Sequence, residues 1–233
     1  MFKQLGLLWV LACVSCASIV DAGSKQYSLD EYQHLSKQLL KKDELFIRSE
    51  LTKLGQKKAA LPDYTKEFGF DVEQPVEWFT SDEGKRIMDI ILSFQTPSGG
   101  WSKRTDMAKE KRKPGYAFGT EEDYVPTFDN SATSTQLMLL AKAYSATSRK
   151  EYLMAFNRGL DYVMSAQYPN GGWPQSFPLR GSYHDHITYN DALMRDLMVL
   201  MLKVSKAKDE FSFVTKEQQA AAKIVWNWRW IAC

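Results

Sequence analysis

The sequence predicts an all-α fold, and three observations indicate an α/α toroid in which helical hairpins surround a central axis. Apolar residues recur three or four positions apart in several segments, as on the buried face of a helix. Alternating runs rich in Val and Thr, which are typical of strands, are scarce. Residues 95–101 (Gln-Thr-Pro-Ser-Gly-Gly-Trp) recur 72 positions later as residues 167–173 (Gln-Tyr-Pro-Asn-Gly-Gly-Trp), each copy following an apolar helical segment.

Residues 1–22 are predicted to be an export signal. Lys3 gives a positive start, residues 5–14 form an apolar run too short to cross a bilayer, and residues 20–22 offer small side chains for cleavage. An alternative is that Val-Leu-Ala-Cys13 is a lipid-attachment box, which would anchor the protein to a membrane through Cys13. We therefore expect a secreted or periplasmic protein, or alternatively a lipoprotein of the cell envelope.

Bulk properties limit what the exported chain can be. Cleavage after Ala22 removes Cys13 and Cys16 and leaves Cys233, so the domain must be stabilised by its apolar core without disulfides. The remaining length suffices for one monomeric domain. The formal charge of +2 gives no support for nucleic-acid binding, so an anionic ligand must be met by local clusters of charge.

The N-terminal part of the mature chain, residues 23–75, is expected to be a helical segment followed by a linker. Residues 29–54 carry apolar residues at helical spacing and are predicted to form two helices with a break near Lys42 and Asp43. Residues 55–75 show no clear period and are predicted to cross the surface.

Residues 76–223 are predicted to form the hairpins of the toroid. Ser81 caps a helix that ends at Pro97 and the Gly99-Gly100 pair. Further helices are predicted over residues 132–145, 150–167 and 191–206, and another begins at 216–223.

The Gly-Gly-Trp turns have a structural explanation, whereas the polar residues that follow them do not. Glycine permits a tight turn, and the Trp packs back between helices. Equivalent loops of a toroid emerge on one face, so their charged residues should converge there. These residues are Lys103 and Arg104 after the first turn, and Arg180, His184, Asp185, His186 and Asp191 after the second. The alternative is a set of solvated loop charges.

Two aspartates, Asp129 and Asp191, admit two interpretations. Each lies where a helix is predicted to start, so each could be an N-cap or interact with the helix dipole. Two aspartates beside one cleft could also share a hard cation such as calcium. A zinc site at His184 and His186 lacks a third ligand, because the only other histidine is the distant His34, and hydrogen-bonding roles are favoured.

Three segments, residues 96–106, 128–136 and 167–191, resemble family 10 polysaccharide lyases, the pectate lyases with an incomplete α/α toroid. The resemblance extends over residues 78–223, and Tyr-His-Asp-His-Ile-Thr-Tyr-Asn-Asp at 183–191 is its most specific part. It implies cleavage of polygalacturonate (pectate) by β-elimination to unsaturated oligogalacturonides, with Ca²⁺ bound by Asp129 and Asp191. It also implies a set of substrate-binding residues: Lys103, Arg104, Asn130, Trp173, Arg180, Tyr183, His184 and His186.

The chain departs from this family near its end. The family's base is an arginine in a segment downstream of Cys233, so no catalytic residue is assigned within this chain. The helical pattern gives way after Lys223 to a crowd of tryptophans at 226–230. We interpret residues 224–233 as an aberrant tail of a truncated lyase whose toroid lacks its C-terminal helices.

Three other functions are compatible with parts of the sequence. An inverting glycoside hydrolase would use Asp129 and Asp191 as acid and base, roughly 6.5–9.5 Å apart. A non-catalytic uronate-binding remnant would account for the missing arginine. A lipid cyclase rests on the Gln-x-x-x-Gly-x-Trp turns alone, and the sequence has no Asp-x-Asp-Asp motif.

Overall fold

The computed structural model describes residues 27–121, 123 and 125–227, and this part of the chain is helical with isolated β-bridges in place of strands. The six α-helices are α1 (Leu29–Leu54), α2 (Asp82–Ser93), α3 (Ser134–Thr147), α4 (Lys150–Ser165), α5 (Leu193–Lys206) and α6 (Lys216–Asn227). Short 3₁₀ segments lie between them: η1 (Val76–Thr80), η3 (Asp129–Ser131), η4 (Tyr183–Asp185), η5 (Asn190–Ala192) and η6 (Asp209–Phe211). The all-α prediction is confirmed.

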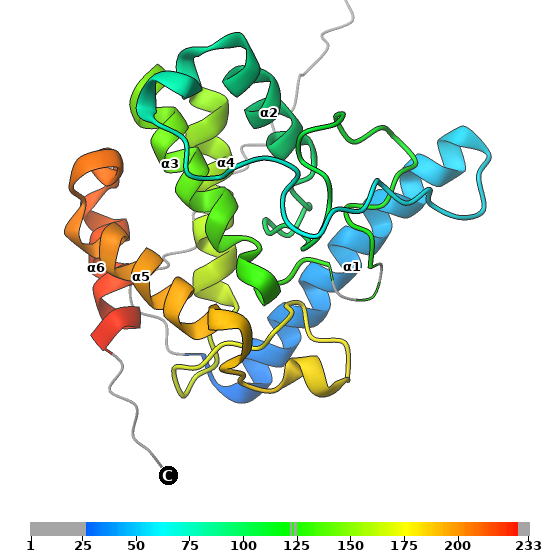
Figure 1. The fold of residues 1–233 in the computed structure, drawn as a ribbon. Helices are drawn as coiled ribbons and strands as arrows, with labels where there is room; N and C mark the ends of the chain where they lie inside the picture. The colour runs from blue at the N-terminus through cyan, green and yellow to red at the C-terminus, as the bar shows by residue number, and fades with distance from the viewer. Residues whose placement is uncertain (1–26, 122, 124, 228–233) are drawn as a thin grey trace, which may run out of the picture.

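The helices pair as hairpins. Helices α3 and α4 pack along each other at the centre of the molecule, α5 and α6 form a second pair beside them, and α1 crosses as one long rod (Figure 1). The predicted boundaries of α3, α4 and α5 lie within about two residues of those observed. None of the described helices has the length and apolar character needed to cross a membrane.

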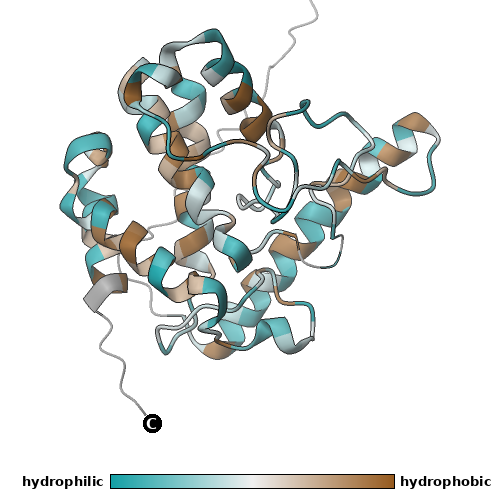
Figure 2. Ribbon diagram, in the orientation of Figure 1, coloured by the Kyte–Doolittle hydropathy of each residue, from teal (hydrophilic) through white to brown (hydrophobic). Residues whose placement is uncertain are grey.

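The core lies where the hairpins meet the two turns. Tyr162 of α4 is buried between the loops, its ring 5.2 Å from that of Phe128, and its hydroxyl donates to the carbonyl of Phe177 at 2.6 Å. Tyr32 brings α1 onto the same core by donating to the carbonyl of Ala166 at 3.0 Å. Apolar residues recur in bands along α3 and α5, separated by hydrophilic ones, as amphipathic packing requires (Figure 2).

The two turns adopt the same hydrogen-bonding pattern. The indole N–H of Trp101 donates to the carbonyl of Ile91 at 2.8 Å, and that of Trp173 donates to Val163 at 2.9 Å. The first glycine of each pair has a left-handed backbone, with φ of 118° at Gly99 and 97° at Gly171. The repeat read from the sequence is therefore a structural repeat.

The predicted break in α1 is wrong. The helix runs unbroken from Leu29 to Leu54, starts with a capping box at Ser28 and ends at the left-handed Gly55. Asp43 does not interrupt it, because its side chain faces the core, where it accepts from the backbone N–H (2.7 Å) and the hydroxyl (2.6 Å) of Ser98. Asp43 therefore contacts the first turn and does not mark the end of a helix.

The expected break after Lys223 is also wrong. Helix α6 continues to Asn227, because Ala221 and Ala222 are buried and Val225 packs against the core, which extends the apolar stripe by one turn. The predicted signal, with its possible lipid-attachment Cys13, and residues 228–233 of the predicted tail lie outside the described residues.

The Asp43–Ser98 contact makes the fold pH-sensitive. Burial raises the pKa of Asp43 from its ordinary 3.8 to about 6, although the bonds from Ser98 oppose the shift. The folded state therefore holds this proton more tightly than the unfolded state, so ionisation of Asp43 reduces stability as the pH rises from about 4 to 6. Because Asp43→Asn cannot ionise, we expect the difference in melting temperature between this variant and wild type to be more favourable to the variant at pH 7 than at pH 4. The measurement is thermal unfolding followed by circular dichroism.

Glu44→Gln, the exposed neighbour on α1, is the matched control and should show no such change between the two pH values. If Asp43→Asn tracked wild type at every pH, Asp43 would not be responsible for the dependence.

Candidate functional site

Two loops of the same shape precede α3 and α5. In η3, Asn130 and Ser131 have φ of 50° and 58°; in η5, Asp191 and Ala192 have φ of 48° and 59°. A non-glycine residue in this left-handed region costs of order 1–3 kcal/mol and persists where its surroundings impose it, most often at functional sites. The two segments contact each other directly. Chain regions 61 positions apart thus meet with matching backbones.

Neither candidate aspartate is a helix cap. The residue before α3 is Thr133 and the residue before α5 is Ala192, and neither makes a side-chain capping bond. The Oδ1 atom of Asp129 accepts from the N–H of Asn130 at 3.0 Å, inside η3 itself. The capping interpretation is wrong, because the left-handed residues separate these carboxylates from the helix starts.

Lys103 and Asp129 form a largely buried ion pair. The Lys103 ammonium lies 2.5 Å from Asp129 Oδ2 and 3.3 Å from Glu121, and the two side chains of the pair are 14% and 6% exposed. Burial alone would raise the pKa of Asp129, but the hydrogen bond and charge of Lys103 outweigh it and hold that pKa below its ordinary value. Burial likewise opposes the charge of Lys103, yet Asp129 raises the Lys103 pKa overall.

The Asp129 carboxylate also interacts with the side chains of Gln175 and Asp191. The two predicted metal ligands therefore lie together. Gln175 belongs to the second turn and Lys103 to the first, so both repeats contribute to the surroundings of Asp129.

The histidines differ in their surroundings. His184 is buried, its Nδ1 lies 3.2 Å from Ser182 Oγ, and its ring contacts that of Tyr183 in a tilted arrangement with centroids 3.8 Å apart. Burial and the nearby charge of Lys103 lower the pKa of His184, which favours a neutral ring. His186 and Tyr183 are exposed. No group of three His, Cys, Asp or Glu side chains within the described ranges is arranged to hold a metal, so the zinc interpretation gains no third ligand there.

Two residues predicted to bind substrate have structural contacts. Trp173 is 2% exposed and its indole N–H is bonded to Val163, so its inclusion among substrate-binding residues is wrong. The same packing that builds the turn removes its ring from solvent. Arg180 donates to the carbonyl of Val125 at 3.2 Å and remains partly exposed.

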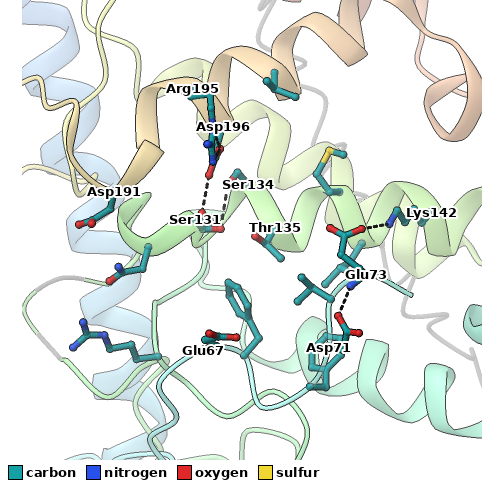
Figure 3. Close-up of a pocket in the computed structure, with 18 of the residues that line it drawn as sticks. Glu67, Asp71, Glu73, Ser131, Ser134, Thr135, Lys142, Asp191, Arg195 and Asp196 are labelled. Carbon is teal, nitrogen blue, oxygen red and sulfur yellow. Dashed lines mark hydrogen bonds and ion pairs between the residues drawn. The ribbon is translucent and has the colours of Figure 1, made fainter. Parts of the chain in front are cut away.

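A groove of about 970 Å³ adjoins the paired loops (Figure 3). Arg104, Asn130 and Asp191 line it, and residues 66–73, α3 and α5 form its sides. Its size lies at the upper end of small-ligand sites, which suits a ligand larger than one sugar. Several lining residues were not predicted: Lys66, Glu73, Ser131, Lys142, Asp196 and Lys203. Only Ser131 carried a sequence signal, because it lies in residues 128–136, one of the three segments on which the family resemblance rests.

The oxygen ligands at the paired loops fit a calcium site that is completed by a bound ligand better than a site that is closed by protein ligands alone. Calcium takes 6–8 oxygen ligands, and the loops bring two carboxylates, Asp129 and Asp191, with Asn130 alongside. Lys103 already neutralises part of Asp129. The remaining ligands would have to come from a bound carboxylate and water, which matches an open site at the end of a groove.

Comparison with known proteins identifies similar sequences and folds. Residues 95–227 match the family model described as pectic acid lyase. A lanosterol synthase of Aspergillus fumigatus is 32% identical over 111 residues, which cover 43% of this chain and 15% of that enzyme.

Two solved structures of a family 10 polysaccharide lyase from Cellvibrio cellulosa share the fold. A variant in complex with trigalacturonic acid is 24% identical with a TM-score of 0.55, over 68% of this chain and 50% of that one. The second is 26% identical with a TM-score of 0.54, over 66% and 48%. The chain spans about half the length of these structures. The likeness confirms the predicted toroid-like all-α fold.

The buried ion pair gives a test of the site's electrostatics. Lys103→Met would leave the Asp129 carboxylate buried without its cation, and we expect a loss of about 3–5 kcal/mol in the free energy of unfolding, measured by urea denaturation. Lys103→Met with Asp129→Asn should lose less than Lys103→Met alone, because no buried charge is then uncompensated.

Lys109→Met serves as the control, since the Lys109–Asp63 pair has side chains 61% and 51% exposed and should contribute little to stability. Equal losses in the Lys103 and Lys109 variants would contradict the assignment of a buried, energetically important pair.

Proposed function

This chain belongs to the pectic acid lyase family, and we propose that its protein cleaves polygalacturonate by calcium-dependent β-elimination, releasing unsaturated oligogalacturonides. The observation that carries the proposal is the meeting of η3 and η5, which sets Asp129 beside Asp191 at the end of a groove, with Lys103 and Arg104 close by. The complex of a structural relative with trigalacturonic acid supports a uronate ligand.

The proposed chemistry needs a carboxylate-bearing sugar. A base removes the proton on C5, the C–H electrons form the C4=C5 double bond, and the glycosidic oxygen leaves C4 with its bonding electrons and gains a proton. Negative charge develops on the uronate carboxylate as C5 loses its proton. A calcium ion held by Asp129 and Asp191 would supply the positive charge that stabilises this enolate.

The chain's own residues have separate roles in this proposal. Lys103 keeps Asp129 ionised at the pH of the reaction, because it lowers the pKa of that carboxyl. Arg104, which lines the groove, would pair with the carboxylate of a bound uronate. Asn130, Tyr183 and His186 complete the proposed sugar-binding surface. In this proposal the described part of the chain supplies binding and polarisation, and none of its residues is assigned as the base.

The hydrolase alternative fits the geometry less well. An inverting hydrolase separates its two carboxyl groups by roughly 6.5–9.5 Å to admit a water molecule. Such an enzyme also needs a general acid with a raised pKa, whereas Lys103 lowers the pKa of Asp129. Binding of uronate without cleavage is the second candidate, because the groove and the paired aspartates would serve binding alone equally well.

We also propose that the protein acts outside the cytoplasm, after removal of residues 1–22 or after lipid attachment at Cys13. The substrate supports this location, since a polysaccharide does not enter the cell intact.

The calcium ligands can be tested by binding. We expect Asp191→Asn to weaken calcium-dependent binding of trigalacturonate by at least about 10-fold, because an amide replaces a charged metal ligand. Mutation of the residues that merely orient a metal ligand already lowers metal affinity by about that factor. Isothermal titration calorimetry with calcium and with a chelator measures it. The control is Asp209→Asn, since Asp209 is also exposed and left-handed but belongs to η6, away from the groove lining.

Product analysis separates the candidate functions. Calcium-dependent release of ultraviolet-absorbing, unsaturated ends identifies the lyase. Retention on pectate without such product identifies a binding protein, and cleavage that survives chelation and yields saturated ends would overturn the proposal in favour of a hydrolase.

A further inference from the structure

We infer that Ser131 and Asp196 are positioning residues that fasten η3 to α5 and thereby hold Asp129 and Asp191 at the separation that a shared cation needs. The inference rests on the proposed function and extends it to two residues to which the sequence assigned no role. Both residues line the groove next to Asn130 and Asp191.

The contact itself is short and charge-assisted. The Ser131 hydroxyl donates to Asp196 Oδ2 at 2.6 Å, across 65 positions of sequence. The other oxygen, Oδ1, accepts from Arg195 Nε at 2.9 Å and Nη2 at 2.8 Å. The Asp196 side chain is 18% exposed, so water competes weakly for it. Such O–H···O⁻ bonds are roughly twice as strong as neutral ones.

The left-handed conformation of Ser131 depends on contacts with the two neighbouring helices. Ser131 follows the left-handed Asn130 and is left-handed itself; asparagine adopts this conformation more readily than most residues, whereas serine has no such preference. Its carbonyl accepts from the Ser134 hydroxyl at 3.0 Å, which ties it to the start of α3. The bond to Asp196 ties it to α5 as well. Because Asp129 begins the same short segment, release of Ser131 would free Asp129 to move relative to Asp191.

Asp196 itself is not part of the proposed cation site. Although it lines the groove, its Oδ2 accepts from Ser131 and its Oδ1 accepts from the Arg195 guanidinium. Figure 3 shows Asp196 directed toward Ser131, while Asp191 lies apart from that contact. It therefore acts through Ser131.

A simpler explanation is that Asp196 only interacts favourably with the helix dipole, because it lies in the first turn of α5. That role would contribute to stability and would not depend on Ser131. The two readings differ in whether Ser131 and Asp196 act as one unit, which a double-mutant cycle measures.

The experiment compares Ser131→Ala, Asp196→Ala and the double variant with wild type. The probes are calcium alone and calcium with trigalacturonate, titrated by calorimetry. We expect each single variant to bind calcium about 10-fold more weakly, as is usual for groups that orient metal ligands. The double variant should be no weaker than the worse single one. Glu210→Gln is the control, because it removes the negative charge of the 2.7 Å pair with Lys203 at the opposite end of α5.

A second measurement follows the loops without metal. Amide hydrogen exchange at residues 129–131 and 190–192 should be faster in Ser131→Ala and Asp196→Ala than in wild type, while α3 and α4 keep their protection. Additive losses in the double variant, calcium binding at wild-type strength in Ser131→Ala, or an equal loss in Glu210→Gln would each overturn the inference.

Failure of the proposed function would look different. In that case wild-type protein would itself bind neither calcium nor trigalacturonate. Fastening of η3 by Asp196 would then be judged by hydrogen exchange alone, where unchanged exchange in both single variants would refute it.

Discussion

The hydrogen bond from each turn tryptophan to a carbonyl ten residues earlier is the constraint on which the other features of this molecule depend. Trp101 reaches back to Ile91 and Trp173 to Val163, each inside or at the end of the preceding helix. A buried indole N–H must find an acceptor, and here the acceptor fixes the angle at which the chain leaves the helix. The loop after each turn therefore starts in a defined place and direction.

Because both loops start from equivalent positions, they can brace each other. Thr127 donates its hydroxyl to the carbonyl of Gln175 at 2.7 Å, and the same carbonyl accepts from the N–H of Phe128 at 2.9 Å. The N–H of Asp129 in turn donates to the Thr127 hydroxyl at 3.1 Å. These hydrogen bonds connect Asp129 and the first loop to the second loop. They explain how the strained segment η3 stays fixed beside the groove.

The electrostatics follow from the same placement. A buried carboxylate is costly unless a cation and hydrogen-bond donors surround it, and Asp129 has both in Lys103 and the neighbouring N–H of Asn130. Lys103 stabilises an ionised Asp129 in the absence of ligand, yet it leaves Asp191 beside it on the exposed side. A divalent cation that binds together with a uronate would neutralise the negative charge that Lys103 leaves at Asp191.

The sequence by itself determined the helices, the repeated turn and the convergence of polar loops on one face, because these depend on periodicity and on glycine and tryptophan chemistry that act over a few residues. It misplaced Asp43 as a helix end, Trp173 as a ligand contact, the two aspartates as possible caps, and the end of α6. Each of these errors concerns which contacts a residue makes in the folded chain, which local pattern does not specify. Only the tertiary structure decided that residues 66–73 face α3 and α5 across a groove, and that Ser131 meets Asp196. Such pairs lie tens of positions apart, and their contact is set by how whole helices pack, a balance of many buried surfaces that no short segment encodes.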